Sequence, residues 1–160
     1  MRGGALPPGL LLAALGFALA FAPRSVLLSA LVAAAMTSIA AVFLTPRTLP
    51  LDLAFAGCWI SVAMTAATVH LPRGPVGWLA MLLAINAGLW SGIVIKLAGA
   101  PSDLARALPS VLLALPGMWL VAHRGGISVK VVASWLIAVA LLAGTLPIVS
   151  TPGYVPDHME

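Results

Sequence analysis

The chain has 160 residues, of which 62% are hydrophobic and 8% are charged, and its mean hydropathy is +1.13. Soluble domains carry about 25% charged residues. Four acids and eight bases cannot cover a globule of this size in water. The composition therefore excludes a soluble globular domain and predicts an all-α, polytopic helix bundle in a lipid bilayer.

The charges are too scattered to indicate a nucleic-acid partner. The formal net charge is +4, but the bases stand singly in short loops and form no basic run. A single cysteine, Cys58, excludes an internal disulfide and a cysteine-based metal knuckle. Arginine outnumbers lysine, and alanine and leucine are abundant. This usage is compatible with a GC-rich bacterial genome, so we expect a cell membrane location, namely the bacterial inner membrane.

The first apolar run covers residues 10–22, after Arg2 and a segment rich in Gly and Pro. A basic start, an apolar core and an Ala-x-Ala site at Ala20 and Ala22 also describe a signal peptide. Pro23 would follow that cut directly, and proline there usually blocks cleavage. We therefore expect a retained but short first span over about residues 6–22.

Turn signals divide the remaining apolar sequence into five more spans. Prolines, glycines and charged residues interrupt it at residues 45–50, 72–75, 101–103 and 123–126, with Ser102 as the expected N-cap after the third of these. The loops are short, so consecutive helices should be antiparallel neighbours in one bundle over residues 1–149, followed by a polar tail, 150–160. A count of five spans is the alternative, because the first is short and Pro116 interrupts the fifth. The expected spans after the first are 25–44, 51–69, 76–100, 104–122 and 127–149.

The basic residues divide equally between the two sides of the six-span arrangement, so the positive-inside rule does not orient it. The loops after the first, third and fifth spans hold Arg24, Arg73, Arg124 and Lys130. The other side holds Arg2, Arg47, Lys96 and Arg106.

The fourth span carries small residues at every fourth position, namely Ala80, Ala84, Gly88 and Gly92. Such a stripe allows another helix backbone to approach closely, so we expect this helix to be the packing centre of the bundle. Asn86 lies near its middle. An amide in hydrocarbon needs a hydrogen-bond partner, which could be a bound solute or a group on a neighbouring helix.

The third span carries a polar stripe on one helical face, formed by Cys58, Ser61, Thr65 and Thr68. We expect this face to point inward, toward Asn86 or toward Ser29, Met36 and Thr37 of the second span. The stripe is interpreted either as the lining for a small polar solute or as hydroxyls that bond back to their own helix.

The sequence contains no catalytic motif and no acid deep within a span, which disfavours an ion-coupled pump acting alone. It predicts no catalytic residue, no metal site and no cofactor. The preferred hypothesis is a non-catalytic subunit that packs against other membrane subunits or against copies of itself. The alternative is a small transporter or channel for a neutral or weakly polar solute, working as a homo-oligomer. A third is a membrane enzyme acting on a lipid or quinone near His70, Arg73, His123 and Arg124.

Overall fold

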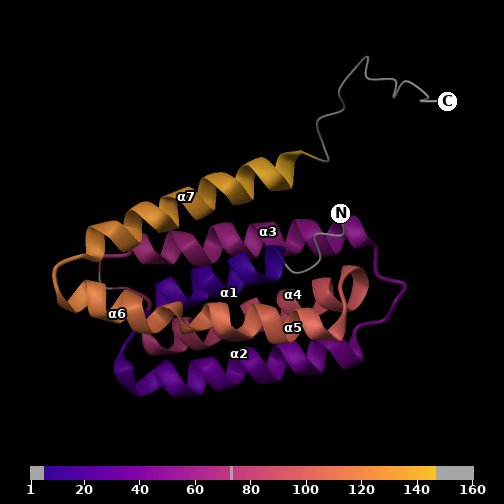
Figure 1. The fold of residues 1–160 in the computed structure, drawn as a ribbon, viewed down its shortest axis with the longest axis horizontal. Helices are drawn as coiled ribbons and strands as arrows, with labels where there is room; N and C mark the ends of the chain where they lie inside the picture. Colours follow the sequence, from indigo (N-terminus) through magenta and orange to yellow (C-terminus); the bar gives the residue numbers. More distant parts are fainter. Residues whose placement is uncertain (1–5, 73, 147–160) are drawn as a thin grey trace, which may run out of the picture.

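The computed structural model describes residues 6–72 and 74–146, and these form helices and turns without a strand. The predicted all-α class is confirmed for these residues, and the helices pack side by side as a bundle (Figure 1). The elements, with η marking 3₁₀ helices, are α1 (Leu6–Leu19), α2 (Arg24–Leu44), α3 (Leu51–Ala67), η1 (Thr68–His70), α4 (Gly77–Ala98), α5 (Pro101–Ala107), η2 (Leu108–Leu113), α6 (Ala114–Ala122) and α7 (Gly126–Thr145).

Five helical stretches among these residues are long and apolar enough to cross a membrane. They are α2, α3 with η1, α4, the continuous stretch Ser102–Ala122 and α7. The expected first span is the one that falls short, since α1 ends at Leu19 and has 14 residues, or about 21 Å. The end of the expected last span, 147–149, and the tail 150–160 lie outside the described residues.

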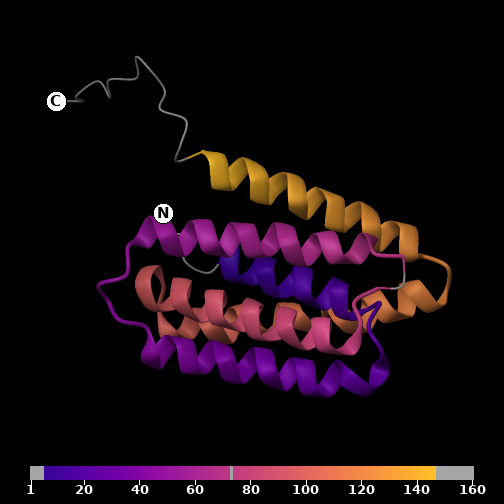
Figure 2. The same cartoon turned by 180° about the vertical axis from the view of Figure 1, so that it is seen from behind.

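The short helix α1 occupies the interior of the bundle. Ten of its 14 residues are buried, and it contacts α3, α4, η2 and α6 (Figures 1 and 2). A helix that is apolar on every side requires apolar neighbours on every side, and this position provides them. The most buried helix is therefore α1, while α4, the expected packing centre, is the most buried of the helices with membrane-spanning length.

The stretch from α5 to α6 bends around α1. Pro109 lies in the 3₁₀ helix η2 and Pro116 lies in α6, and each removes a backbone N–H. The backbone of η2 rests on Gly16 of α1, where an added Cβ would lie 2.7 Å from the Val111 carbonyl oxygen. The Ser110 hydroxyl donates to the Gly9 carbonyl at 2.9 Å. This bend allows a proline-interrupted segment to cover the central helix.

The start of α5 differs from the expected N-cap at Ser102. The helix begins at Pro101 with Ala100 as its N-cap residue. The Asp103 carboxylate accepts a hydrogen bond from the Ala100 N–H at 2.9 Å and lies 3.4 Å from the Arg106 guanidinium. Asp103 therefore caps the helix from within its first turn. Pro101 can occupy the same turn because a residue there does not need a free N–H.

Helices α2 and α4 meet along a seam of small residues, which we call the α2–α4 seam. A Cβ added at Gly88 would collide with the Thr37 hydroxyl and the Ala34 carbonyl oxygen, and one added at Gly92 with the Ser38 carbonyl oxygen. This seam is the main contact that α2 makes. The seam consists of Ala30, Ala34, Ser38 and Ala41 from α2, and Ala80, Ala84, Gly88 and Gly92 from α4, all of which are buried.

Large apolar side chains cover the outside of the bundle. Phe43 on α2 is 77% exposed and Ile127 on α7 is also 77% exposed. Soluble monomers rarely present contiguous apolar surface of this extent. Others on the same outer surface are Leu28, Met36, Leu53, Ile60, Trp78, Leu82, Leu115, Trp119, Val131 and Leu142.

Replacement of Gly88 with alanine tests the α2–α4 seam. We expect Gly88→Ala to lower the free energy of unfolding by about 1–3 kcal/mol, because the added methyl group overlaps the α2 backbone. The measurement is denaturant unfolding in detergent micelles. The matched control is Gly144→Ala on α7, whose added Cβ would meet the Trp59 Cβ at an ordinary 3.5 Å. The control should be neutral or stabilising by up to about 1 kcal/mol, and an equal response of the two variants would contradict the seam.

Candidate functional site

The polar stripe of α3 lies mostly in the interior of the bundle. Cys58 and Thr65 have no exposed surface, Ser61 is 3% exposed, and Thr68 is half-buried. The opposite side of α3 faces α7, where Ala56, Trp59 and Ala63 line a groove. The stripe therefore faces α1 and α4, the other helices that α3 contacts. The predicted neighbours on α2 do not lie opposite it, because Ser29 and Met36 are exposed on the outside of the bundle.

The hydroxyls of the stripe are not equally satisfied. Thr68 Oγ1 donates to the Thr65 carbonyl at 2.7 Å, which is the local back-bonding expected of a hydroxyl in a helix. Thr65 Oγ1 is buried with no hydrogen-bond partner. Ser91 Oγ on α4 is buried in the same state. Among the residues that the structure describes, these two fully buried hydroxyls have no partner and are available to another group.

Asn86 lies at the edge of α4 rather than deep in the bundle. It is half-buried, and none of the side-chain hydrogen bonds among residues 6–72 and 74–146 involves it. One turn further along, the Trp90 ring lies against Gly57 of α3. Helices α3 and α4 are antiparallel (Figure 2). The residue one turn before Trp90 in α4 therefore lies level with the residue about one turn after Gly57 in α3. Asn86 is therefore at about the depth of Ser61.

The small-residue stripe of α4 is used inside the chain. Gly88 and Gly92 face α2 across the seam, and Ala80 and Ala84 have no exposed surface. A partner subunit therefore cannot use these four residues unless α2 is displaced. This placement removes one of the features that supported partner packing in the sequence, the others being the lack of catalytic groups and of a soluble domain.

Sequence reasoning missed two contacts that position the candidate residues. Gly57 provides the space that the Trp90 ring fills, and α2 carries its own small stripe at Ala30, Ala34 and Ser38. The spacing of four residues in α2 was a readable signal, of the same kind as that in α4. The pairing of Gly57 with Trp90 had no sequence signal, because the two residues lie on different helices.

The residues of the enzyme hypothesis make separate contacts at one end of the bundle. His70 Nε2 is 3.3 Å from Ser134 Oγ, while His123 Nδ1 is 2.8 Å from the Trp119 carbonyl oxygen. The rings of His123 and Trp119 stack with centroids 4.6 Å apart. Arg124 adopts a left-handed backbone with φ 63° in the same turn, and Arg73 lies outside the described residues. His70 and His123 thus have separate polar partners, on α7 and on α6 respectively.

Titratable side chains do not gather anywhere in the described part of the chain as a metal site would require. Among residues 6–72 and 74–146, no three His, Cys, Asp or Glu side chains are grouped so that they could hold a metal ion. Cys58 is buried as a free thiol between the helices.

A groove runs along the outside of the bundle between α3 and α7, which move apart toward the end of α7 (Figure 1). It has a volume of about 360 Å³. The Thr145 hydroxyl at its end donates to the Leu141 carbonyl at 2.9 Å. Its lining is Ala56, Trp59, Ile60, Ala63, Met64, Ala140, Leu141, Gly144 and Thr145.

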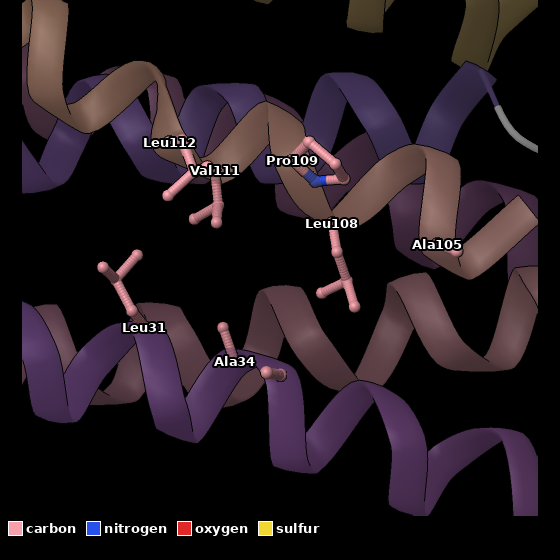
Figure 3. A pocket seen from close by; sticks show the side chains of 8 residues that line it. Leu31, Ala34, Ala105, Leu108, Pro109, Val111 and Leu112 are labelled. Atoms are coloured by element: carbon pink, nitrogen blue, oxygen red, sulfur yellow. The ribbon is translucent and has the colours of Figure 1, made fainter.

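Another groove, of about 320 Å³, separates α2 from η2. Leu31 and Ala34 on α2 point across it toward Leu108 and Val111 on η2 (Figure 3). The gap exists because η2 packs on α1 while α2 packs on α4. Its lining is also apolar.

Comparisons with protein families, with curated proteins and with solved structures found no match to this chain.

Two buried serines test whether the unpaired hydroxyls serve the fold. Ser91 and Ser38 both have no exposed surface, but Ser38 Oγ donates to the Ala34 carbonyl at 2.8 Å while Ser91 Oγ has no partner. We expect Ser91→Ala to leave the free energy of unfolding unchanged or to raise it by about 1 kcal/mol, because it removes an unsatisfied buried group. Ser38→Ala should lower it by about 1 kcal/mol. Both are measured by unfolding in micelles, and a larger loss for Ser91→Ala would show that its hydroxyl is paired in solution.

Proposed function

We propose that this chain is a polytopic integral membrane protein in which α2, α3, α4, the α5–α6 stretch and α7 cross the bilayer, with α1 as a short sixth span. The support is the apolar outer surface on helices of membrane-spanning length. Lipid is the medium in which this surface is stable. The proposed location is the bacterial inner membrane, for which the arginine, alanine and leucine usage is the support.

Within the membrane, the chain is proposed to act as a non-catalytic subunit that holds a transmembrane helix of a partner in the α3–α7 groove. The observation that supports this is the small-residue lining of the groove. Ala56 and Ala63 of α3 face Ala140 and Gly144 of α7 across a space of about 360 Å³. Helices associate in lipid mainly through close van der Waals packing, for which small residues provide the access.

The choice of this groove follows from where the other small residues lie. The stripe on α4 is covered by α2, as the overlap at Gly88 and Gly92 shows. By contrast, Ala56 is exposed and Gly144 is half-buried, so an incoming helix can reach both. The α2–η2 groove also has alanines, at Ala34, Ala35 and Ala105, but Ala34 is already buried in the α2–α4 seam.

Transport of a neutral solute has one observation in its favour, namely the unpaired hydroxyls of Thr65 and Ser91. The α1 helix fills the space beside the polar face of α3. A solute could therefore reach these hydroxyls only if α1 moved aside. Membrane packing requires no such movement, and it is the preferred function.

Cysteine accessibility tests the membrane arrangement. Cys58 has no exposed surface and should remain unlabelled, so Thr48→Cys and Ala122→Cys can each report on one end of the bundle. We expect a membrane-impermeant maleimide to label one of the two positions in sealed inverted vesicles and the other in intact cells or spheroplasts. Labelling of both positions from the same side would contradict the spanning arrangement.

Filling the α3–α7 groove tests the subunit role. Ala56→Leu places a bulky side chain in the groove, whereas Ala67→Leu makes the same change at an exposed position of α3 outside it. We expect Ala56→Leu to reduce recovery of the partner chains at least tenfold when the protein is purified from native membranes in mild detergent and quantified by mass spectrometry. Ala67→Leu should retain them. If both variants co-purify with the same chains at wild-type yield, the groove is not the partner site.

A further inference from the structure

The charges of the described residues are distributed unequally between the two ends of the bundle. One end, which we call the basic end, is formed by residues 20–24, 70–72, 74–76 and 122–125 and by the start of α7. It contains Arg24, Arg124 and Lys130 and no described acid. The opposite end contains three bases, Arg47, Lys96 and Arg106, together with Asp52 and Asp103. In Figure 1 the basic end is on the left.

Phe21 holds the turns of the basic end together. Gly74 has φ +66°, and a Cβ there would lie 2.5 Å from the Phe21 carbonyl oxygen. On the other side, the Phe21 ring approaches within 3.7 Å of a Cβ built at Gly126. Residues of the other two segments thus lie beside Phe21, with Gly74 against its backbone and Gly126 near its ring.

Two exposed tryptophans are placed at this same end. Trp78 lies in the first turn of α4 and is 67% exposed, and Trp119 lies in the last turn of α6 and is 61% exposed. Tryptophan is enriched where a helix passes from lipid tails to head groups, because its ring is apolar and its N–H is polar. The pair indicates that the adjoining bases lie at head-group depth.

Polar groups that can contact a phosphate accompany these bases. His70 Nε2 meets Ser134 Oγ at 3.3 Å, and Ser134 Oγ donates to the Lys130 carbonyl at 3.0 Å. Lys130 and Ser134 are one turn apart on α7, so the Lys130 backbone carbonyl, the imidazole and the hydroxyl lie in one small area. Arg124 is exposed in the adjoining turn.

We propose that the basic end binds the phosphate groups of anionic phospholipids, with Arg24, Arg124 and Lys130 as the charged contacts. This inference rests on the proposed membrane insertion. A lipid is favoured over an acidic protein because these bases lie in short turns beside interfacial tryptophans, where head groups are already present. Basic residues next to membrane helices favour anionic lipid by about 1 kcal/mol each, or about fivefold each.

The test compares two triple variants with equal loss of charge. Arg24→Gln with Arg124→Gln and Lys130→Gln removes the described bases of the basic end. Arg47→Gln with Lys96→Gln and Arg106→Gln removes those of the opposite end, where Asp52 and Asp103 remain. The full chain is reconstituted in vesicles of phosphatidylcholine and phosphatidylglycerol and extracted in mild detergent, and the two co-purified lipids are quantified by mass spectrometry. We expect wild type and the opposite-end variant to be enriched in phosphatidylglycerol. The basic-end variant should lose that enrichment by about fivefold for each base removed.

Equal enrichment in the basic-end variant and wild type would overturn the proposal, as would equal loss in both variants. Displacement of the lipid by inorganic phosphate, but not by chloride at equal ionic strength, would also overturn it, because the site would then bind free phosphate. If a triple variant fails to fold in phosphatidylcholine alone, Arg24→Gln and Arg47→Gln make the same comparison at exposed positions. Failure of wild type to insert into vesicles would instead contradict the proposed membrane location.

Discussion

Close approach of helix backbones at small residues is the interaction on which the rest of this bundle depends. When helices associate in lipid, burying apolar surface between them gains little free energy, because the lipid tails are equally apolar. Association therefore depends on how closely the helix surfaces fit together. At Gly88 and Gly92 the backbone of α2 occupies the space of a missing side chain, and at Gly16 the backbone of η2 does the same. Each of these contacts attaches an outer helix to an inner one.

The burial of α1 explains how these contacts form a single interior. This helix is apolar on all sides and touches both the α3–α4 pair and the bent segment from η2 to α6. The bend at Pro109 and Pro116 lets that segment follow α1, and the side chain of Ser110 bonds to its backbone at Gly9. The interior is consequently filled by α1, and the grooves lie on the outside. This arrangement favours a packing role over a path through the molecule.

The candidate site shows why residue pattern alone was an incomplete guide. The inward direction of Cys58, Ser61 and Thr65 follows from their spacing on one helical face, and the structure buries all three. Which helix they face could not be read from spacing, because that depends on the order of helices around α1. The same limit applies to the α4 stripe. Its small residues indicated a close neighbour, but nothing in the pattern distinguished α2 of the same chain from a helix of another protein.

Composition and hydropathy by themselves determined the all-α class, the approximate helix positions and the lack of recognisable catalytic motifs, because these depend on local sequence. Tertiary structure decided the rest. It placed the short α1 in the centre, used the α4 stripe within the chain, left the α3–α7 groove open and brought Gly74 and Gly126 next to Phe21. These features depend on which helices become neighbours. In a chain whose spans are almost uniformly apolar, hydrophobicity does not distinguish one neighbour from another, and only the fit between particular small and large side chains does.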